Sequence, residues 1–225
     1  MKIKFGFLMM GALFFMASCG GGNSTKTANN ETETENHEGH DHEGHDHGTE
    51  EVAAAETYTV DAEASNIRWE GGTAGVTVYS HFGDINVQEG MLEVTGEEIT
   101  GGSFVVDMTS IDPKDDGYSE ENTPADLVGH LSTGDFFLVE EHPTASFEIT
   151  GMSEGAVMGN LTIRGNTNEE TVNLETMDVA EDGTMTAKGT LTFDRQKYEV
   201  KWAHYLKDVI LKDDIDLEIT LVAKK

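Results

Sequence analysis

Residues 215–221 read Ile-Asp-Leu-Glu-Ile-Thr-Leu, so large apolar side chains alternate with polar ones. Successive side chains of a β-strand point to opposite faces, and this pattern therefore predicts a strand with one buried and one solvated face. The same period of two recurs at residues 104–109, 147–149 and 190–194. The C-terminal part of the chain is thus predicted to be an antiparallel sheet that is wet on one side.

Turn residues divide this region into about eight segments of strand pattern. Turns are predicted at Gln88-Glu89-Gly90, Glu154-Gly155 and Glu181-Asp182-Gly183. The predicted strands lie around residues 66–72, 76–87, 91–109, 144–152, 156–164, 170–179, 184–194 and 214–223. An all-β meander of this size predicts a sandwich or a closed barrel, and closure would remove the exposed strand edges.

One segment departs from the strand pattern, Thr-Pro-Ala-Asp-Leu-Val-Gly-His-Leu-Ser-Thr-Gly at residues 123–134. Thr123 can cap a helix, Pro124 suits the first helical position, and Gly134 can end the helix. Leu127, Val128 and Leu131 would share one face. A short helix is therefore predicted near 123–134, packed over a sheet edge or closing one end of a barrel.

The N-terminus has the features of an export signal. Lys2 and Lys4 precede an apolar run that is too short to span a membrane and that ends in small residues. Ala17-Ser18-Cys19-Gly20 resembles the bacterial lipobox, which implies a signal peptide at 1–18 and acylation of Cys19. A single cysteine cannot form an internal disulfide, and lipidation gives it a role.

A change in composition near residue 57 separates two regions. Residues 19–57 are mostly small, polar, acidic or histidine, so they cannot bury enough surface to offset the entropy of ordering. They are predicted to form a disordered tether. Residues 58–225 are long enough for one domain with a sizeable core.

The tether contains the unit Glu-Gly-His-Asp-His twice, at 38–42 and 43–47. Imidazole suits zinc, copper or nickel, and neighbouring carboxylates attract cations. Metal binding or buffering by the tether, with a mainly structural barrel, is therefore one functional hypothesis, and a hydrophilic spacer is the other interpretation of this stretch. The predicted ligands are His37, His40, His42, His45 and His47.

The chain is strongly acidic, with 43 acidic and 14 basic residues and a formal charge of −29. From Tyr58 onward there are 33 acidic and 11 basic residues, a net charge of −22. Phosphate would repel such a surface, which excludes nucleic acid as an expected partner.

Four blocks of the domain resemble the YceI-like family: residues 101–108, 129–137, 142–148 and 159–167. The resemblance implies a lipocalin-like, extended eight-stranded antiparallel barrel with an apolar lumen. It also implies a secreted or periplasmic protein that binds a polyisoprenoid chain. The stretch around Trp69 and His81 is shorter and more polar than is usual in the family, and a narrower lumen there would favour a shorter quinone or fatty acid.

A barrel of eight strands encloses room either for interlocking side chains or for one small ligand. We expect a subset of the inward apolar residues to line a lipid-binding tunnel, while the alternative is that they fill a core. The predicted lipid-binding residues are Phe104, Val106, Met108, Phe147, Ile149, Leu161, Ile163, Leu191, Phe193, Ile215, Leu217, Ile219 and Leu221.

No catalysis is predicted and no cofactor is required. His81, His130, His142 and His204 are the candidate catalytic groups, but none lies in a recognisable catalytic motif. Trp69 and Trp202 are expected to pack in the barrel. Arg68, Arg164 and Arg195 are expected to form salt bridges at strand ends.

The cellular location is predicted from the acyl anchor, which would hold the protein at a membrane. Gly20 is not the aspartate that favours inner-membrane retention in some bacteria, so an outer-membrane lipoprotein facing the periplasm is expected. The oligomeric state, including a homodimer, stays open.

Overall fold

The computed structural model describes residues 54–76 and 78–225, all of which belong to one unit, residues 50–225. Helix α1 spans Pro124–Leu131, and short 3₁₀ turns span Met108–Ser110 and Arg195–Tyr198. The strands are β1 (Glu56–Val60), β2 (Asn66–Gly75), β3 (Ser80–Ile85), β4 (Val87–Thr95), β5 (Glu98–Asp107), β6 (Asp112–Pro113), β7 (Thr144–Ser153), β8 (Ala156–Ile163), β9 (Asn166–Val179), β10 (Met185–Asp194), β11 (Val209–Leu211) and β12 (Asp214–Lys224).

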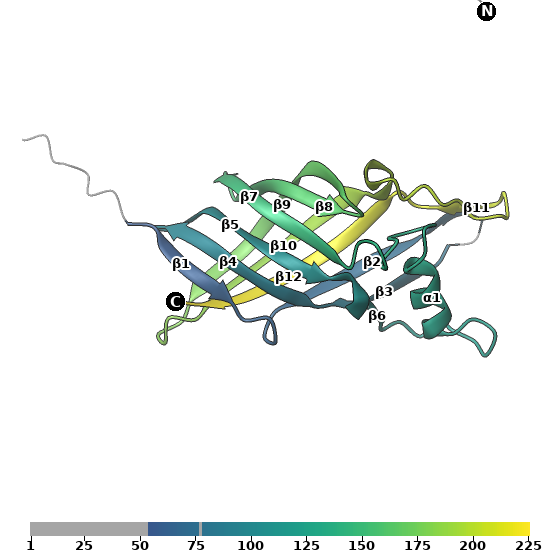
Figure 1. Ribbon diagram of the computed structural model, residues 1–225, viewed down its shortest axis with the longest axis horizontal. Coiled ribbons are helices and arrows are strands. Elements are labelled where there is room, and N and C mark those ends of the chain that lie inside the picture. The colour runs from purple at the N-terminus through teal and green to yellow at the C-terminus, as the bar shows by residue number, and fades with distance from the viewer. Residues whose placement is uncertain (1–53, 77) are drawn as a thin grey trace, which may run out of the picture. The chain divides into compact units, whose positions relative to one another are not determined.

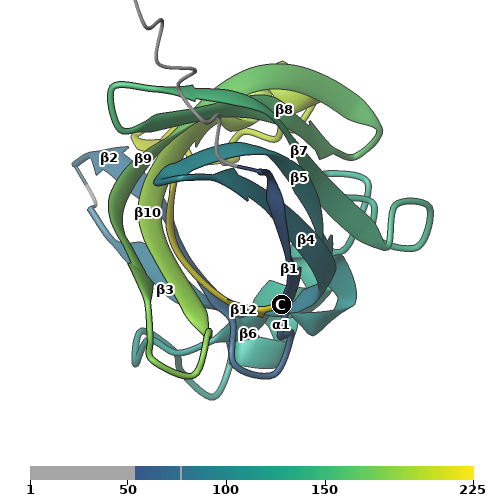
Figure 2. The same ribbon diagram turned by 90° about the vertical axis from the view of Figure 1, so that its left-hand side faces the viewer.

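The sheet closes on itself. Neighbouring strands follow the order β1-β4-β5-β7-β8-β9-β10-β12, all antiparallel, and β1 also pairs with β12 through Thr59↔Lys224 and Val60↔Ala223. Figure 2 shows the resulting ring of strands seen end on. The predicted eight-stranded antiparallel barrel is confirmed, and a sandwich is excluded.

Two positions in the ring are each occupied by two strands that follow one another in the sequence, β1 with β2 and β3 with β4. β1 and β2 are separated by a turn at residues 61–65, in which Ser65 Oγ donates to the Asp61 carbonyl at 2.7 Å. β12 consequently pairs with β1 near its C-terminus and with β2 from Asp216↔Glu70 to Thr220↔Asn66. β3 and β4 are likewise separated at Asn86. β1 was not among the predicted strands, and it begins at Glu56.

The alternation that predicted β12 is present in the structure. Ile219, Leu221 and Ala223 are buried and face the interior. Asp216 and Glu218 are exposed, and the Thr192 hydroxyl of β10 donates to Asp216 Oδ1 at 2.6 Å. The register of β10 and β12 is unbroken from Asp194↔Asp214 to Met185↔Ala223.

Two of the three predicted turns are confirmed. Glu154 and Gly155 link β7 to β8 with φ values of 53° and 80°, the left-handed conformation that a two-residue hairpin needs. Residues 181–183 link β9 to β10, and Gly183 has φ of 81°. Glycine adopts this conformation without steric cost.

The prediction of a third turn at Gln88-Glu89-Gly90 is wrong, and so is the prediction of a single strand over residues 91–109. β4 runs through Glu89 and Gly90 with only a bulge at Gln88, and the chain reverses at Gly96, where φ is 65°. A Cβ at Gly90 would lie 2.7 Å from Phe104 Cβ, so this glycine allows close strand packing and does not form a turn. β3 also begins at Ser80, later than predicted.

The predicted helix is confirmed in position but ends earlier. The Thr123 side chain accepts from the Asp126 N–H while Asp126 Oδ2 accepts from the Thr123 N–H, which forms a capping box. The helix ends at Leu131 with Ser132 as its cap, whereas Gly134 had been expected to end it. Figure 1 shows α1 at one end of the barrel, where Val128 and Leu131 pack against the core.

Candidate functional site

The barrel encloses a cavity of about 240 Å³. Its walls come from the inward positions of nearly every strand of the ring, together with α1 and the segments around residues 136 and 202. The lining is almost wholly apolar. Eleven of the thirteen predicted lipid-binding residues line it: Phe104, Val106, Met108, Phe147, Leu161, Ile163, Leu191, Phe193, Ile215, Leu217 and Ile219.

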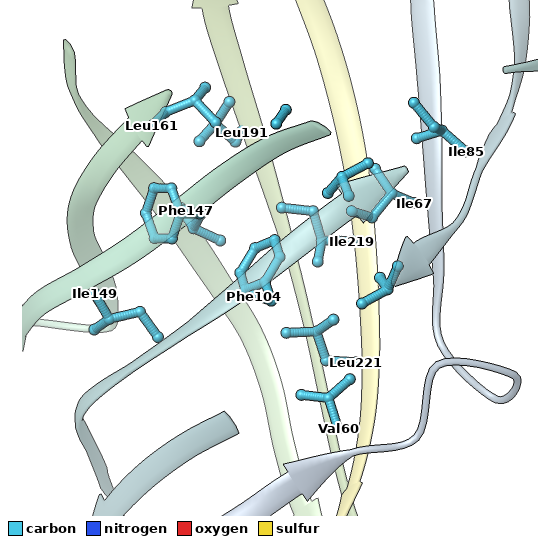
Figure 3. Close-up of a cluster of buried hydrophobic side chains, with 14 of the residues drawn as sticks. Val60, Ile67, Ile85, Phe104, Phe147, Ile149, Leu161, Leu191, Ile219 and Leu221 are labelled. Carbon is cyan, nitrogen blue, oxygen red and sulfur yellow. The ribbon is translucent and has the colours of Figure 1, made fainter. Parts of the chain in front are cut away.

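The remaining two predicted residues line a second, smaller cavity. Ile149 and Leu221 border a space of about 40 Å³ further along the lumen. Phe104 and Phe147 line both cavities, and their ring centroids lie 5.6 Å apart. In Figure 3 the two rings lie side by side, with Leu161 and Leu191 to one side of them and Ile149 to the other.

The position of Phe147 depends on a glycine on the neighbouring strand. A Cβ at Gly159 would lie 2.4 Å from Cζ of Phe147, so only glycine leaves room for the ring there. Register pairs Ile149 with Gly159 and Phe147 with Leu161, which directs Phe147 inward from β7. Phe104 and Phe147 thus lie together at one end of the larger cavity. We call this pair the aromatic floor.

The opposite end of the cavity is covered by α1 and an aromatic cluster. The His130 ring meets Phe136 and Trp202 edge on, at centroid distances of 5.0 and 4.9 Å. His130 Nε2 also lies 3.3 Å from Asp135 Oδ2. His130 therefore anchors the end of α1 to the loop that follows, and Leu127 and Leu131 complete this cover.

A polar cluster borders the cavity near β3. His81 Nδ1 lies 3.0 Å from Asp115 Oδ2, and the Tyr118 hydroxyl donates to Asp115 Oδ1 at 2.8 Å. The His81 ring stacks on Tyr118 and meets Tyr79 edge on. Burial would raise the pKa of Asp115, but the hydrogen bonds from His81, Tyr118 and the Gly117 N–H outweigh burial and hold this pKa below its usual value. An ionised Asp115 fixes the loop after β6 against the cavity wall.

Arg195 is a buried cation beside the apolar cavity. Its guanidinium donates to the carbonyls of Lys212 and Trp202, both at 3.0 Å, and also to that of Val200. Nη2 pairs with Asp213 Oδ1 at 2.9 Å. Burial lowers the pKa of Arg195 and the Asp213 charge opposes that shift. These four acceptors give the side chain a structural role and confirm the predicted salt bridge.

The other two arginines differ from each other. Arg68 pairs with Glu218 at 3.4 Å on the outer face, as expected for a surface salt bridge. The prediction is wrong for Arg164, which lies in the turn between β8 and β9 and donates to the carbonyls of Glu199 and Gly134 at 2.6 and 2.8 Å. Its role is to hold two loops together.

A closed antiparallel barrel with an apolar cavity is the architecture that the resemblance of the four sequence blocks implies. The family model described as "YceI-like domain" matches residues 58–223. The chain belongs to the YceI-like family. This YceI-like match covers every strand of the barrel apart from the first two residues of β1 and the last residue of β12.

Curated relatives of the YceI-like domain include UPF0312 proteins of Staphylococcus aureus. Those of strains bovine RF122 / ET3-1 and USA300 are each 36% identical over 96 residues, which is 40% of this chain and 56% of theirs. The chain therefore spans about half the length of the curated relatives it matches.

Solved structures similar to the YceI-like domain are more distant in sequence. BcnA of Burkholderia cenocepacia has a TM-score of 0.48 at 17% identity, over 73% of this chain and 99% of that one. A polyisoprenoid binding domain from Saccharophagus degradans has a TM-score of 0.49 at 13% identity, over 74% and 97%.

Several predicted sites fall outside the residues that the structure describes. Cys19 and the metal ligands His37, His40, His42, His45 and His47 are among them, so their roles stay predictions. Within residues 54–76 and 78–225 of the YceI-like chain, no group of three or more His, Cys, Asp or Glu residues could hold a metal ion. No helix in this part of the chain is long and apolar enough to cross a membrane.

Sequence reasoning missed part of the wall of the YceI-like cavity. Ile67 and Ile85 lie on β2 and β3 and are buried at its edge. Trp69 and Trp202, expected to be packing residues, line the cavity too, and Trp69 Nε1 donates to the Asp84 carbonyl at 3.3 Å. The alternation Ile67-Arg68-Trp69 was the available signal for β2, whereas the position of Trp202 in a loop gave none.

Proposed function

We propose that this YceI-like domain binds one apolar lipid, of the isoprenoid class, inside the barrel and without catalysis. The observation that carries the proposal is the cavity of about 240 Å³ inside the barrel, walled by inward apolar side chains of a closed sheet. The family resemblance supplies the isoprenoid class. Each methylene transferred from water into such a cavity contributes about 0.8 kcal/mol, so a short hydrocarbon chain is enough for useful affinity.

The size of the cavity limits the ligand. Its volume is below the roughly 300–1,000 Å³ of most small-molecule pockets. The aromatic floor also borders both cavities, where it would hinder a straight chain that extends toward the smaller one. We therefore propose a chain of a few isoprene units, or a quinone or fatty acid of similar length.

The setting that we propose is the cell envelope. In this scheme the signal peptide at 1–18 directs export, Cys19 carries the acyl anchor, and the residues between Cys19 and the start of β1 at Glu56 connect it to the barrel. The protein would then be an outer-membrane lipoprotein whose barrel faces the periplasm. Labelling with a radioactive fatty acid in cells, compared between the wild-type chain and Cys19→Ala, tests the anchor directly.

Ligand binding is tested by extracting lipid from protein purified without detergent and identifying it by mass spectrometry. Added prenyl alcohols and fatty acids of graded length should then bind with a one-to-one stoichiometry. Ala145→Phe is the matched variant, because Ala145 lines the cavity and a phenylalanine there would occupy it. Failure to recover any apolar molecule, together with no binding of added lipid, would show that the lumen is only a packed core.

Metal binding by the tether is a second proposed function. It is favoured by the repeated Glu-Gly-His-Asp-His unit, which together with the preceding His37 places five histidines within eleven positions. Zinc or copper would be the cation, because imidazole suits both. The two functions lie on different segments and can be tested separately.

A further inference from the structure

Exposed apolar side chains gather at one end of the barrel. Six of the eight large hydrophobic residues that are exposed in residues 54–76 and 78–225 belong to two neighbouring segments, the β2–β3 hairpin and the segment before and within β11. Their exposed fractions run from 42% to 87%. We name these residues the apolar rim: Val76, Val78, Tyr79, Tyr205, Leu206 and Ile210.

The apolar rim is continuous in space. β11 pairs with the end of β2 through Ile210↔Ala74 and Val209↔Gly75, and the Val209 N–H donates to the Leu206 carbonyl at 3.1 Å. In Figure 1 β11 projects at the same end of the barrel as α1. Exposed apolar groups that cluster in this way mark an interaction surface, whereas isolated ones do not.

The apolar rim also adjoins the cavity. Tyr79 belongs to both, and Leu211, the residue after Ile210, lines the cavity. Gly71 and Gly72, at the base of the same hairpin, line it as well. A partner that covers the rim would therefore lie beside the part of the wall through which a lipid could pass.

The charge around the apolar rim differs from that of the rest of the domain. Residues 71–80 contain no charged side chain. Residues 195–212 hold five of the eleven basic residues of the domain and two acidic ones, with Asp213 and Asp214 directly after them, in a domain of net charge −22. Three of the five cations, Arg195, Lys197 and Lys201, are ion-paired. The other two, Lys207 and Lys212, are exposed and make no ion pair with any described residue.

We propose that the apolar rim docks on a lipid bilayer that carries anionic headgroups. Valine, leucine and isoleucine side chains would enter the boundary of the acyl region, tyrosines would lie at headgroup level, and Lys207 and Lys212 would contact the phosphates. At physiological ionic strength the Debye length is about 8 Å, so acidic groups further along the barrel repel the membrane little.

A second copy of this chain is the competing occupant, and charge argues against it. Two rims that met face to face would bring together their own lysines, with two bodies of charge −22 behind them. An anionic bilayer instead offers the opposite charge to the lysines and an apolar layer to the rim. It also offers the pool from which an apolar ligand would come, a consequence that rests on the proposed lipid binding.

The test is partition of the protein on vesicles without added ligand. The chain from Gly20 to Lys225 is suitable because it lacks the predicted signal peptide and lipidated cysteine but retains the whole closed barrel. Vesicles of phosphatidylcholine are compared with vesicles that contain one-third phosphatidylglycerol. We expect binding to the second kind that weakens as salt is raised.

Three variants make the test specific. Val78→Ser/Leu206→Ser/Ile210→Ser should lower the partition coefficient at least tenfold. Lys207→Gln/Lys212→Gln should lower it about 25-fold on anionic vesicles, since each lysine near such a surface is worth roughly a factor of five. Met91→Ser/Val179→Ser removes two hydrophobic residues exposed to 48% and 55% outside the rim and should have no effect.

The outcomes separate this proposal from the proposed function. The rim variant is the triple variant Val78→Ser/Leu206→Ser/Ile210→Ser. Membrane docking would be overturned if this variant and the wild-type chain partitioned equally onto vesicles. It would also be overturned if the variant converted a dimer to a monomer without any change in vesicle binding. Lipid capacity measured in solution is independent of both results, because the rim variant retains the cavity. If the proposal holds, the rim variant should bind the same amount of prenyl lipid but take it from vesicles more slowly.

Discussion

The rings of Phe104 and Phe147 lie 5.6 Å apart and border both the larger cavity and the smaller one. Each comes from a different strand, β5 or β7, and the pairing Phe104↔Phe147 places them directly opposite each other. Both are almost fully buried. Val172 and Ile219 also border both cavities, so these four side chains lie where the larger cavity meets the smaller one.

Shortening the aromatic floor should change the preferred length of ligand. In Phe104→Leu and Phe147→Leu the two cavities would join, and a chain longer by one isoprene unit should gain at least tenfold in affinity because more methylenes are buried. Each variant should lose about 1 kcal/mol or more of stability. Titration with prenyl alcohols of graded length measures the effect.

Leu221→Ala is the control for that prediction, because Leu221 lines only the smaller cavity. It should leave the affinity for a short chain unchanged. An unaltered length preference in all three variants would mean that the floor does not limit the ligand.

Removing the Asp115 carboxylate should loosen the loop that follows β6. Asp115→Asn is expected to cost about 1–3 kcal/mol at pH 7, since it weakens partly buried hydrogen bonds with His81 and Tyr118. Asp116→Asn, which changes an exposed neighbour, should have little effect. Urea denaturation of the three proteins provides the comparison.

The cost of Asp115→Asn should depend on pH. Because the folded state lowers the pKa of Asp115, its stabilisation is complete above the usual carboxyl pKa of about 4 and is lost as pH falls through the lower folded pKa. The stability gap between the wild type and the variant should therefore narrow below about pH 4. A gap that widened on acidification would contradict this account.

Arg195 should matter for stability and not for ligand affinity. Arg195→Met leaves the carbonyls of Lys212, Val200 and Trp202 without their donor and should cost about 3 kcal/mol or more. Arg68→Met removes an exposed salt bridge and should cost at most about 1 kcal/mol. The affinity of the folded Arg195→Met variant for prenyl lipid is measured by titration. A fall in this affinity, and not only in stability, would show that Arg195 contacts the headgroup of the lipid.

Deletion of residues 36–48 should abolish zinc or copper binding in calorimetry and leave lipid binding intact. Affinity of the wild-type chain for the metal should fall between about pH 7.5 and 5.5, because histidines with a pKa near 6.5 release metal when they protonate. Metal retained by the deletion variant would place a site in the barrel. An affinity that did not change with pH would argue against imidazole ligands.

The strands that could be predicted are those whose two faces meet different surroundings. β10 and β12 alternate strictly because one face lines the lumen and the other meets water. The β4–β5 hairpin was missed because Gly90 looked like a turn residue, while its actual role is to let the backbone approach Phe104. A glycine that allows close strand packing and a glycine that forms a turn look alike in the sequence. Only the pairing register of the strands distinguishes them.

The thirteen inward residues were predictable from alternation, but the shape of the lumen was not. Whether a barrel is filled or hollow depends on how side chains from all its strands meet, as Phe147 meets Gly159. The cluster of His81, Asp115 and Tyr118 joins a strand to an irregular loop, and no periodic pattern links them. Their relationship emerges only when the chain is folded.

The pairing of β1 with β12 has a consequence for how the molecule forms. Thr59 and Lys224 are neighbours in the sheet although 165 positions separate them in the chain. Contacts of such long range make folding slow, because much of the chain must be ordered before they form. A chain delivered across a membrane from its N-terminus would keep both sheet edges open until its final strand arrived, and would depend on protection from aggregation until then.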